Sequence, residues 1–93
     1  MRKPADAKLI QALAAEIKSR RSTLGISQEE LAHRAGLNRT FVGKIEIAAT
    51  QPSFTVLFGL ATALNVTVVE LVRAIEVRVR KEFSGHREPK ASK

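Results

Sequence analysis

Apolar residues recur at intervals of three and four along most of this chain, which is the spacing of amphipathic helices and not of strands. The first run follows Pro4 and Asp6 and ends at about Thr23, because Gly25 interrupts the pattern. Its apolar positions are Leu9 or Ile10, Leu13 and Ile17. The chain is therefore expected to open with one long helix.

Two short helices are predicted between Ser27 and Glu46, on either side of a turn. Ser27 is a good N-cap, and Glu30 three residues later completes a capping box. Gly36 ends the first helix in a left-handed conformation at low steric cost, and Asn38 caps the second. The buried positions are expected to be Leu31 and Ala35 in the first helix, Val42 and Ile45 in the second, and Leu37 between them.

The rest of the apolar pattern predicts two more helices. Ser53 caps the first of them, which ends at Asn65, and Thr67 caps the second, with Glu70 again three residues on. Their inward positions are expected to be Val56 or Leu57, Leu60 and Leu64, followed by the stripe Val68, Val72, Ile75, Val79 and Phe83.

These elements add up to an all-α fold, a compact five-helix bundle. A chain of 93 residues makes one domain, which we place at residues 1–83 with the extended last helix included. From residue 84 the composition turns to Gly, His, Arg, Pro, Lys and Ser. Residues 84–93 are therefore expected to form a basic, disordered tail.

The last helix is longer than such a bundle requires. Val79 and Phe83 lie one to two turns beyond the part that the domain is expected to absorb, and left exposed they would extend an apolar strip past the edge of the monomer. We predict that they form the interface of a two-fold homodimer. The alternative is that the helix frays after Arg78.

The composition narrows the class of protein. A net charge of +7 and a pI near 10.6 indicate a polyanionic partner. The chain has no cysteine, no apolar run near the roughly 20 residues that span a bilayer, and no apolar block of signal-peptide type after its basic first residues. It is expected to be a cytoplasmic protein without a membrane partner, since the lack of cysteine fits a reducing compartment.

No catalytic or metal-binding pattern stands out in the sequence. His33 and His86 are isolated, without partners at ligand spacing, so no metal site is expected. No nucleophile–base pairing and no glycine-rich phosphate loop is recognisable. We expect a protein that is not an enzyme and needs no cofactor.

Polar and basic side chains open the second short helix, while its apolar residues face the first. This is the layout of a helix-turn-helix that lays its second helix in the major groove of DNA. By geometry Arg39, Thr40 and Lys44 point into the groove, where Arg39 could offer a bidentate fork to a guanine. Gln28 opens the first helix, where backbone N–H groups and the helix dipole suit a phosphate.

The span from about Ile17 to Leu71 resembles the Xre/Cro-type helix-turn-helix domain of phage repressors and small bacterial regulators, which has a lambda repressor-like fold. The matching stretches are Leu24–Ala32, Ala35–Val42, Lys44–Glu46, Pro52-Ser53 and Ala63–Val66. Among the subfamilies, the run Gly-Leu-Asn-Arg-Thr-Phe at Gly36–Phe41 looks most like the controller proteins of restriction–modification systems.

The resemblance implies a sequence-specific transcriptional regulator that binds a palindromic or pseudo-palindromic double-stranded DNA operator as a dimer. It places base contacts at the start of the second helix, and it implies that Gln28 touches the DNA backbone and braces a recognition-helix side chain. The expected DNA-binding residues are Gln28, Asn38, Arg39, Thr40, Phe41, Gly43 and Lys44. Phe41 could equally pack on the first helix, Gly43 could serve helix packing, and Arg21 could pair with Glu46 instead of meeting DNA.

The chain departs from the family pattern after Glu46. The family continues with a basic residue, a Gly and further polar or basic residues, whereas this chain has Ile47-Ala48-Ala49-Thr50-Gln51-Pro52. The missing Gly suggests that the second short helix runs on or ends differently, and the missing cations remove phosphate contacts. Two other functions stay open: an antitoxin that neutralises a partner toxin, and an adaptor that uses this fold without reading bases.

Overall fold

Five α-helices make up the described part of the chain. The computed structural model describes the backbone of residues 4–84 and the side chains of residues 6–81. The helices are α1 (Pro4–Leu24), α2 (Gln28–Ala35), α3 (Arg39–Glu46), α4 (Phe54–Ala63) and α5 (Val68–Ser84), and residues 4–84 contain no strand. The prediction of an all-α, five-helix fold is confirmed.

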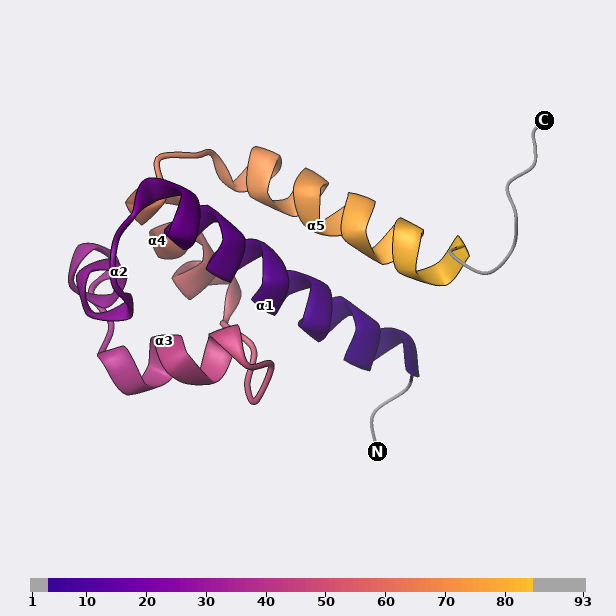
Figure 1. The fold of residues 1–93 in the computed structure, drawn as a ribbon, viewed down its shortest axis with the longest axis horizontal. Helices are drawn as coiled ribbons and strands as arrows, with labels where there is room; N and C mark the ends of the chain where they lie inside the picture. The colour runs from indigo at the N-terminus through magenta and orange to yellow at the C-terminus, as the bar shows by residue number, and fades with distance from the viewer. Residues whose placement is uncertain (1–3, 85–93) are drawn as a thin grey trace.

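The two long helices form one side of the molecule. Helices α1 and α5 lie side by side and run in opposite directions, with α3 on the far side of α1 from α5 (Figure 1). Helix α2 packs against α3, and α4 contacts both α2 and α5. The arrangement leaves one long side of α3 uncovered at the edge of the molecule.

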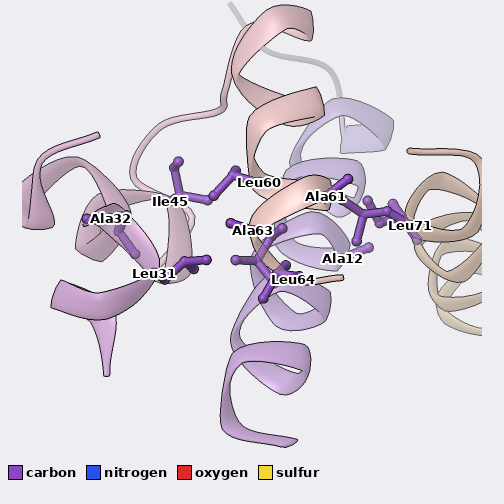
Figure 2. Packing of buried hydrophobic residues seen from close by; sticks show 12 residues of the cluster. Ala12, Leu31, Ala32, Ile45, Leu60, Ala61, Ala63, Leu64 and Leu71 are labelled. Atoms are coloured by element: carbon purple, nitrogen blue, oxygen red, sulfur yellow. The ribbon is translucent and has the colours of Figure 1, made fainter. Parts of the chain in front are cut away.

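The core is aliphatic. Side chains from all five helices meet in one cluster, part of which is shown in Figure 2. Its fully buried members are Ile17, Leu31, Val42, Ile45, Leu60 and Leu71. The inward positions predicted for the first four helices are confirmed in outline, with Ile10 rather than Leu9 facing inward on α1.

Side-chain caps begin the helices where the sequence predicts them. The Ser27 Oγ accepts from the Glu30 N–H at 2.9 Å, the Asn38 Oδ1 from the Phe41 N–H at 2.8 Å, and the Ser53 Oγ from the Val56 N–H at 3.2 Å. Thr67 and Glu70 form a complete capping box, with each side chain accepting from the other's backbone N–H at 3.0 Å. The box predicted at Ser27 is only half formed, because the Glu30 carboxylate accepts from Arg34 Nε at 2.8 Å instead.

Helices α1 to α4 all end with the same motif. In each, two N–H groups just past the helix bond back to carbonyls of its last turn. The motif contains one left-handed residue in each case: Gly25 after α1, Gly36 after α2, Ala48 after α3 and Asn65 after α4. Their φ angles lie between 61° and 72°. The expectation that α3 runs on or ends differently for want of a glycine is therefore wrong, since Ala48 adopts the glycine conformation.

We expect Ala48→Gly to raise the free energy of unfolding by about 0.5–1 kcal/mol. A left-handed conformation costs an L-residue about 1–2 kcal/mol, and the added flexibility of glycine in the unfolded chain offsets only part of that gain. Urea denaturation measures the change. Ala49→Gly is the matched control, because Ala49 does not have a positive φ and should lose stability. A loss in both variants would contradict the prediction.

The inward stripe of α5 differs from the predicted one at one position. Leu71 is fully buried, whereas Val72 is 45% exposed. Val79 is half-buried and packs against the chain's own core, because the 21-residue α1 runs far enough to cover it. Phe83 lies in the last turn of α5, and its side chain is outside the described residues. Fraying after Arg78 is also wrong, since α5 continues to Ser84.

An ion pair fastens the second half of α5 to α1. Glu16 is 8% exposed and its carboxylate accepts from Arg78 Nε at 2.7 Å and from Arg20 Nε at 2.6 Å. Burial alone would raise the pKa of Glu16, but the bonds from Arg78 and Arg20 outweigh it and hold that pKa below its ordinary value. The bond from Arg78 holds the second half of α5 against α1.

Helix α4 is the most apolar of the five, and it carries no charged residue. Its inner side chains Leu60, Ala61 and Ala63 are buried in the core. Among residues 4–84, no single helix is both long and apolar enough to cross a membrane, and α4 reaches that length only when joined to α5 around a 102° bend.

Candidate nucleic-acid interface

Helix α3 has one buried side and one open side. Val42 and Ile45 are 0% and 1% exposed and anchor the helix on the core. Arg39, Thr40 and Lys44 are exposed, and within the described residues Arg39 and Lys44 form no ion pair. The open side therefore presents two cations that no carboxylate of residues 6–81 neutralises, together with the hydroxyl of Thr40.

The turn between α2 and α3 is held by backbone bonds. Gly36 has a φ of 71°, and the Leu37 N–H donates to the Ala32 carbonyl at 2.8 Å. Leu37 is half-buried against the core, as predicted. Asn38 uses its carbonyl oxygen to cap α3, and its amide N–H₂ is left to meet a ligand. The two short helices thus form one rigid unit.

A buried ion pair joins α1 to the end of α3. Arg21 Nε and one terminal nitrogen donate to the two carboxylate oxygens of Glu46 at 2.6 and 3.0 Å. The other terminal nitrogen of Arg21 donates to the Ile26 carbonyl at 2.8 Å. The Glu46 side chain is 1% exposed and that of Arg21 15%. Of the two roles considered for Arg21, the structure supports pairing with Glu46.

Gln28 is part of the same network. Its Nε2 donates to Glu46 Oε1 at 3.0 Å, which fixes the orientation of the amide at the start of α2. Burial would raise the pKa of Glu46, but the hydrogen bonds from Arg21 and then Gln28 outweigh it and lower that pKa. Glu46 therefore remains a carboxylate and keeps Gln28 in one place. The pair of Arg21 with Glu46 was one of the two predicted alternatives, whereas the hydrogen bond from Gln28 to Glu46 was not predicted.

Gln28 and Gly43 meet where α2 crosses α3. A Cβ built on Gly43 would lie 3.7 Å from Gln28 Oε1, an ordinary contact, so packing does not require glycine here. Phe41 is half-buried and packs against the core cluster, which is the structural one of its two alternatives. Gly43 follows Arg39 by four residues on α3, so Gln28, Gly43 and Arg39 lie along the same side of that helix.

The loop that follows α3 adds no charge to this surface. Residues 47–53 contain no Lys, Arg, Asp or Glu, and Ile47 is 73% exposed. Lys18, on α1, compensates in part: it is exposed, and it is close enough to Glu46 to contribute to lowering the pKa of that carboxyl. Exposed cations on or near α3 thus include Lys18, Arg39 and Lys44.

The surface has the features of a binding site. Among the described residues no group of three or more His, Cys, Asp and Glu could hold a metal ion. Cations and hydrogen-bond donors on one exposed helix, beside a helix N-terminus, are suited to phosphates and base edges. His86 and the rest of the predicted basic tail lie outside the described residues, apart from the backbone of Ser84 at the end of α5.

Comparison with known proteins identifies the same segment. Residues 17–71 match the family described as helix-turn-helix. Control protein C.SmaI from Serratia marcescens is 38% identical over 60 residues, which are 64% of this chain and 71% of that protein.

Two solved structures of restriction–modification controller proteins are similar in fold. C.AhdI from Aeromonas hydrophila has a TM-score of 0.65 and 34% identity, over 67% of this chain and 94% of that one. Wild-type C.Esp1396I has a TM-score of 0.73 and 26% identity, over 78% of this chain and 95% of that one. Residues 17–71, which match the helix-turn-helix family, include α2 and α3.

Proposed function

Since the chain belongs to the helix-turn-helix family and is a DNA-binding regulator of the controller-protein type, we propose that it binds a two-half-site operator as a homodimer. Each copy inserts α3 into the major groove of one half-site. Such half-sites lie about one helical turn, roughly 34 Å, apart. The proposal includes transcriptional control from that operator.

The observation that carries the proposal is the division of α3. Val42 and Ile45 hold it on the core while Arg39, Thr40 and Lys44 stand free. In this arrangement Arg39 donates to guanine O6 and N7, Thr40 meets a neighbouring base, and Lys44 meets a phosphate. Gln28, held by Glu46, contacts the backbone of the same half-site. Asn38 and Gly43 complete the surface.

We extend the role named for the relatives, control of restriction–modification, to this chain. Restriction and methyltransferase genes beside its own gene would support that role. The antitoxin alternative has no support in the family match or in the relatives. The family is one of transcription regulators, so an enzymatic function is not proposed.

Selection of bound sequences from a random pool of double-stranded DNA tests the function. We expect enrichment of an inverted repeat whose half-site centres are about ten base pairs apart. Enrichment of a single unpaired site would remove the dimer from the proposal. Recovery of unselected sequences would remove specific operator binding.

Replacing Arg39 by Ala is expected to cost about 1–3 kcal/mol per half-site on the selected sequence and to relax the preference at one base pair. Fluorescence anisotropy with matched and singly altered duplexes measures both effects. Gln28→Ala is the comparison variant, because loss of a backbone contact should weaken selected and unselected DNA alike. If Arg39→Ala kept full discrimination, α3 would not be the reading helix.

The predicted homodimer contact at Val79 and Phe83 does not follow from an exposed apolar strip. Val79 already packs on the chain's own core, so it is not the exposed end of an apolar strip. The side chain of Phe83 lies outside the described residues. The dimer contact at Val79 and Phe83 therefore stays a prediction, which sedimentation of a variant with polar residues at both positions would test.

A further inference from the structure

A groove on the surface of the protein lies between the two long helices, α1 and α5. Because these helices run in opposite directions, the first half of α1 lies beside the second half of α5 (Figure 1). The groove has a volume of about 420 Å³, which is within the range of sites for small ligands. It is lined by Lys8, Gln11, Ala12 and Ala15 of α1 and by Arg78 and Lys81 of α5.

The groove follows from the spacing of the residues that line it. Lys8, Ala12 and Ala15 recur at intervals of four and three, so they share one side of α1. Arg78 and Lys81 share one side of α5 in the same way. Ala12 is buried and Ala15 is half-buried, and their single methyl groups leave space that longer side chains would fill. Long cationic side chains from both helices thus surround a hollow with small side chains at its base.

The charge of this groove differs from that of three other hollows on the surface. Each of those hollows includes a carboxylate, from Glu76, Asp6 or Glu16. None of the six residues that line the groove between α1 and α5 is acidic, and three of them are cations. Like charges held close together repel, and an anion placed between them removes that repulsion.

Glu16 balances only part of this charge. Its carboxylate accepts from Arg78 Nε at 2.7 Å, and it also accepts from Arg20 Nε. The guanidinium of Arg78 has further N–H donors on its two terminal nitrogens. The side chain is 38% exposed, and its bond to Glu16 orients the planar group before a ligand arrives. Donors arranged in this way suit the oxygens of a phosphate.

The net charge of the chain is concentrated in the same parts of the sequence. Residues 17–71, which form the helix-turn-helix match, contain six Lys or Arg and four Glu, a net charge of +2. The whole chain has a net charge of +7, so most of the excess lies in residues 1–16 and 72–93. All six residues that line the groove belong to these two segments. DNA reading by α3 does not account for cations at this place.

We propose that the groove between α1 and α5 binds a small phosphate ligand with two or more negative charges, such as a diphosphate or triphosphate group. Lys8, Arg78 and Lys81 donate to the phosphate oxygens, and the amide of Gln11 adds a neutral donor. None of the lining residues is aromatic or a large apolar residue, so the ligand is recognised by its charge and not by a base. The site goes beyond the proposed function and does not depend on it.

The backbone of DNA is a second source of phosphate, and the arrangement of the helices favours the free ligand. Helix α1 lies between α3 and α5, so the groove is on the side of α1 that faces away from α3 (Figure 1). A half-site held by α3 therefore does not reach the groove. The experiments below distinguish the two sources.

The first test is isothermal titration calorimetry with inorganic pyrophosphate at an ionic strength held constant with NaCl. We expect the parent to bind one pyrophosphate per chain. Lys8→Gln/Lys81→Gln should weaken binding about tenfold or more, because two charge-assisted contacts are lost. The matched control, Lys18→Gln/Lys44→Gln, removes the same charge from positions on or near α3 and should bind as the parent does. Equal weakening in both variants, or no saturable binding by the parent, would overturn the proposal.

A second variant keeps the charge of the groove and changes its space. Ala15→Leu fills part of the hollow without altering the net charge, and it should also weaken pyrophosphate binding about tenfold, since a ligand that no longer fits loses its contacts with the cations. Thermal unfolding without ligand shows that the variant is folded. Pyrophosphate should raise the unfolding temperature of the parent, because it binds only the folded chain. A folded Ala15→Leu variant that bound pyrophosphate as the parent does would show that the groove is not the site.

Titration in the presence of saturating double-stranded DNA identifies the source of the phosphate. Pyrophosphate should bind the protein–DNA complex with the same dissociation constant as the free protein, because α3 and the groove are separate. Displacement of pyrophosphate from the groove by DNA would assign this site to the DNA backbone and overturn the free ligand. A parent that binds pyrophosphate in the groove but binds no operator would support this inference while removing the proposed function.

Discussion

Replacing Arg21 by Ala is expected to lower the free energy of unfolding by about 3–5 kcal/mol, a large part of the stability of a small domain. The variant leaves the carboxylate of Glu46 buried, at 1% exposure, without its two strongest donors. It also removes a donor from the Ile26 carbonyl. Urea denaturation followed by circular dichroism measures the loss.

The control is the neighbouring arginine. Arg20→Ala removes a partly exposed partner of Glu16, but Arg78 remains on that carboxylate, so the loss should be about 1 kcal/mol or less. The double variant Arg21→Met/Glu46→Leu should recover much of the lost stability, because it removes the unpaired charge. Similar losses of stability in Arg21→Ala and Arg20→Ala would contradict the prediction that the Arg21–Glu46 pair contributes more to stability.

The pH dependence of this stability loss distinguishes the effect of the unpaired charge on Glu46 from the effect of lost packing. The folded-state pKa of Glu46 lies below its ordinary value of 4.5, so its contribution to stability is present above that value and is lost as pH falls through the folded pKa. In Arg21→Ala the largest cause of that lowering is absent. The difference in stability between parent and variant should therefore be full at neutral pH and shrink in acid. A difference that is constant with pH would point to lost packing instead.

The sequence predicts best those features that depend on near neighbours. The caps at Ser27, Asn38, Ser53 and Thr67 each need only a side chain and an N–H three residues away, and all four form. Glu30 is an exception, because two donors within four residues compete for its carboxylate. The choice between the Ser27 N–H and Arg34 is not visible in the spacing alone.

Features that depend on distant packing could not be predicted in the same way. Helix α5 has valines on several sides, so spacing alone offers Val72 as readily as Leu71 for the inner stripe. The contact with α1 decides between them, and the bond from Arg78 to Glu16, 62 residues apart, fixes the result. The same reach of α1 covers Val79.

The largest effect on function is expected from salt. Lys18, Arg39 and Lys44 are exposed cations on or near α3 in each copy, which makes six in a dimer. With 6–8 phosphate contacts per dimer, the logarithm of the association constant should fall with the logarithm of salt concentration at a slope of about −5 to −7. Affinity for the operator should then fall about a thousandfold or more from 50 to 200 mM salt.

Single substitutions should show which side chains produce the slope of the salt dependence. This distinguishes contacts of the α3 surface from a general effect of net charge. Lys44→Ala removes one phosphate contact per copy and should reduce the steepness by about 2 in the dimer. Arg73→Ala removes the same charge from the exposed side of α5, across α1 from α3 (Figure 1), and should leave the slope unchanged. Equal changes in both variants would mean that the net charge of +7, and not the α3 surface, attracts DNA. A parent slope near zero would exclude DNA as the main partner.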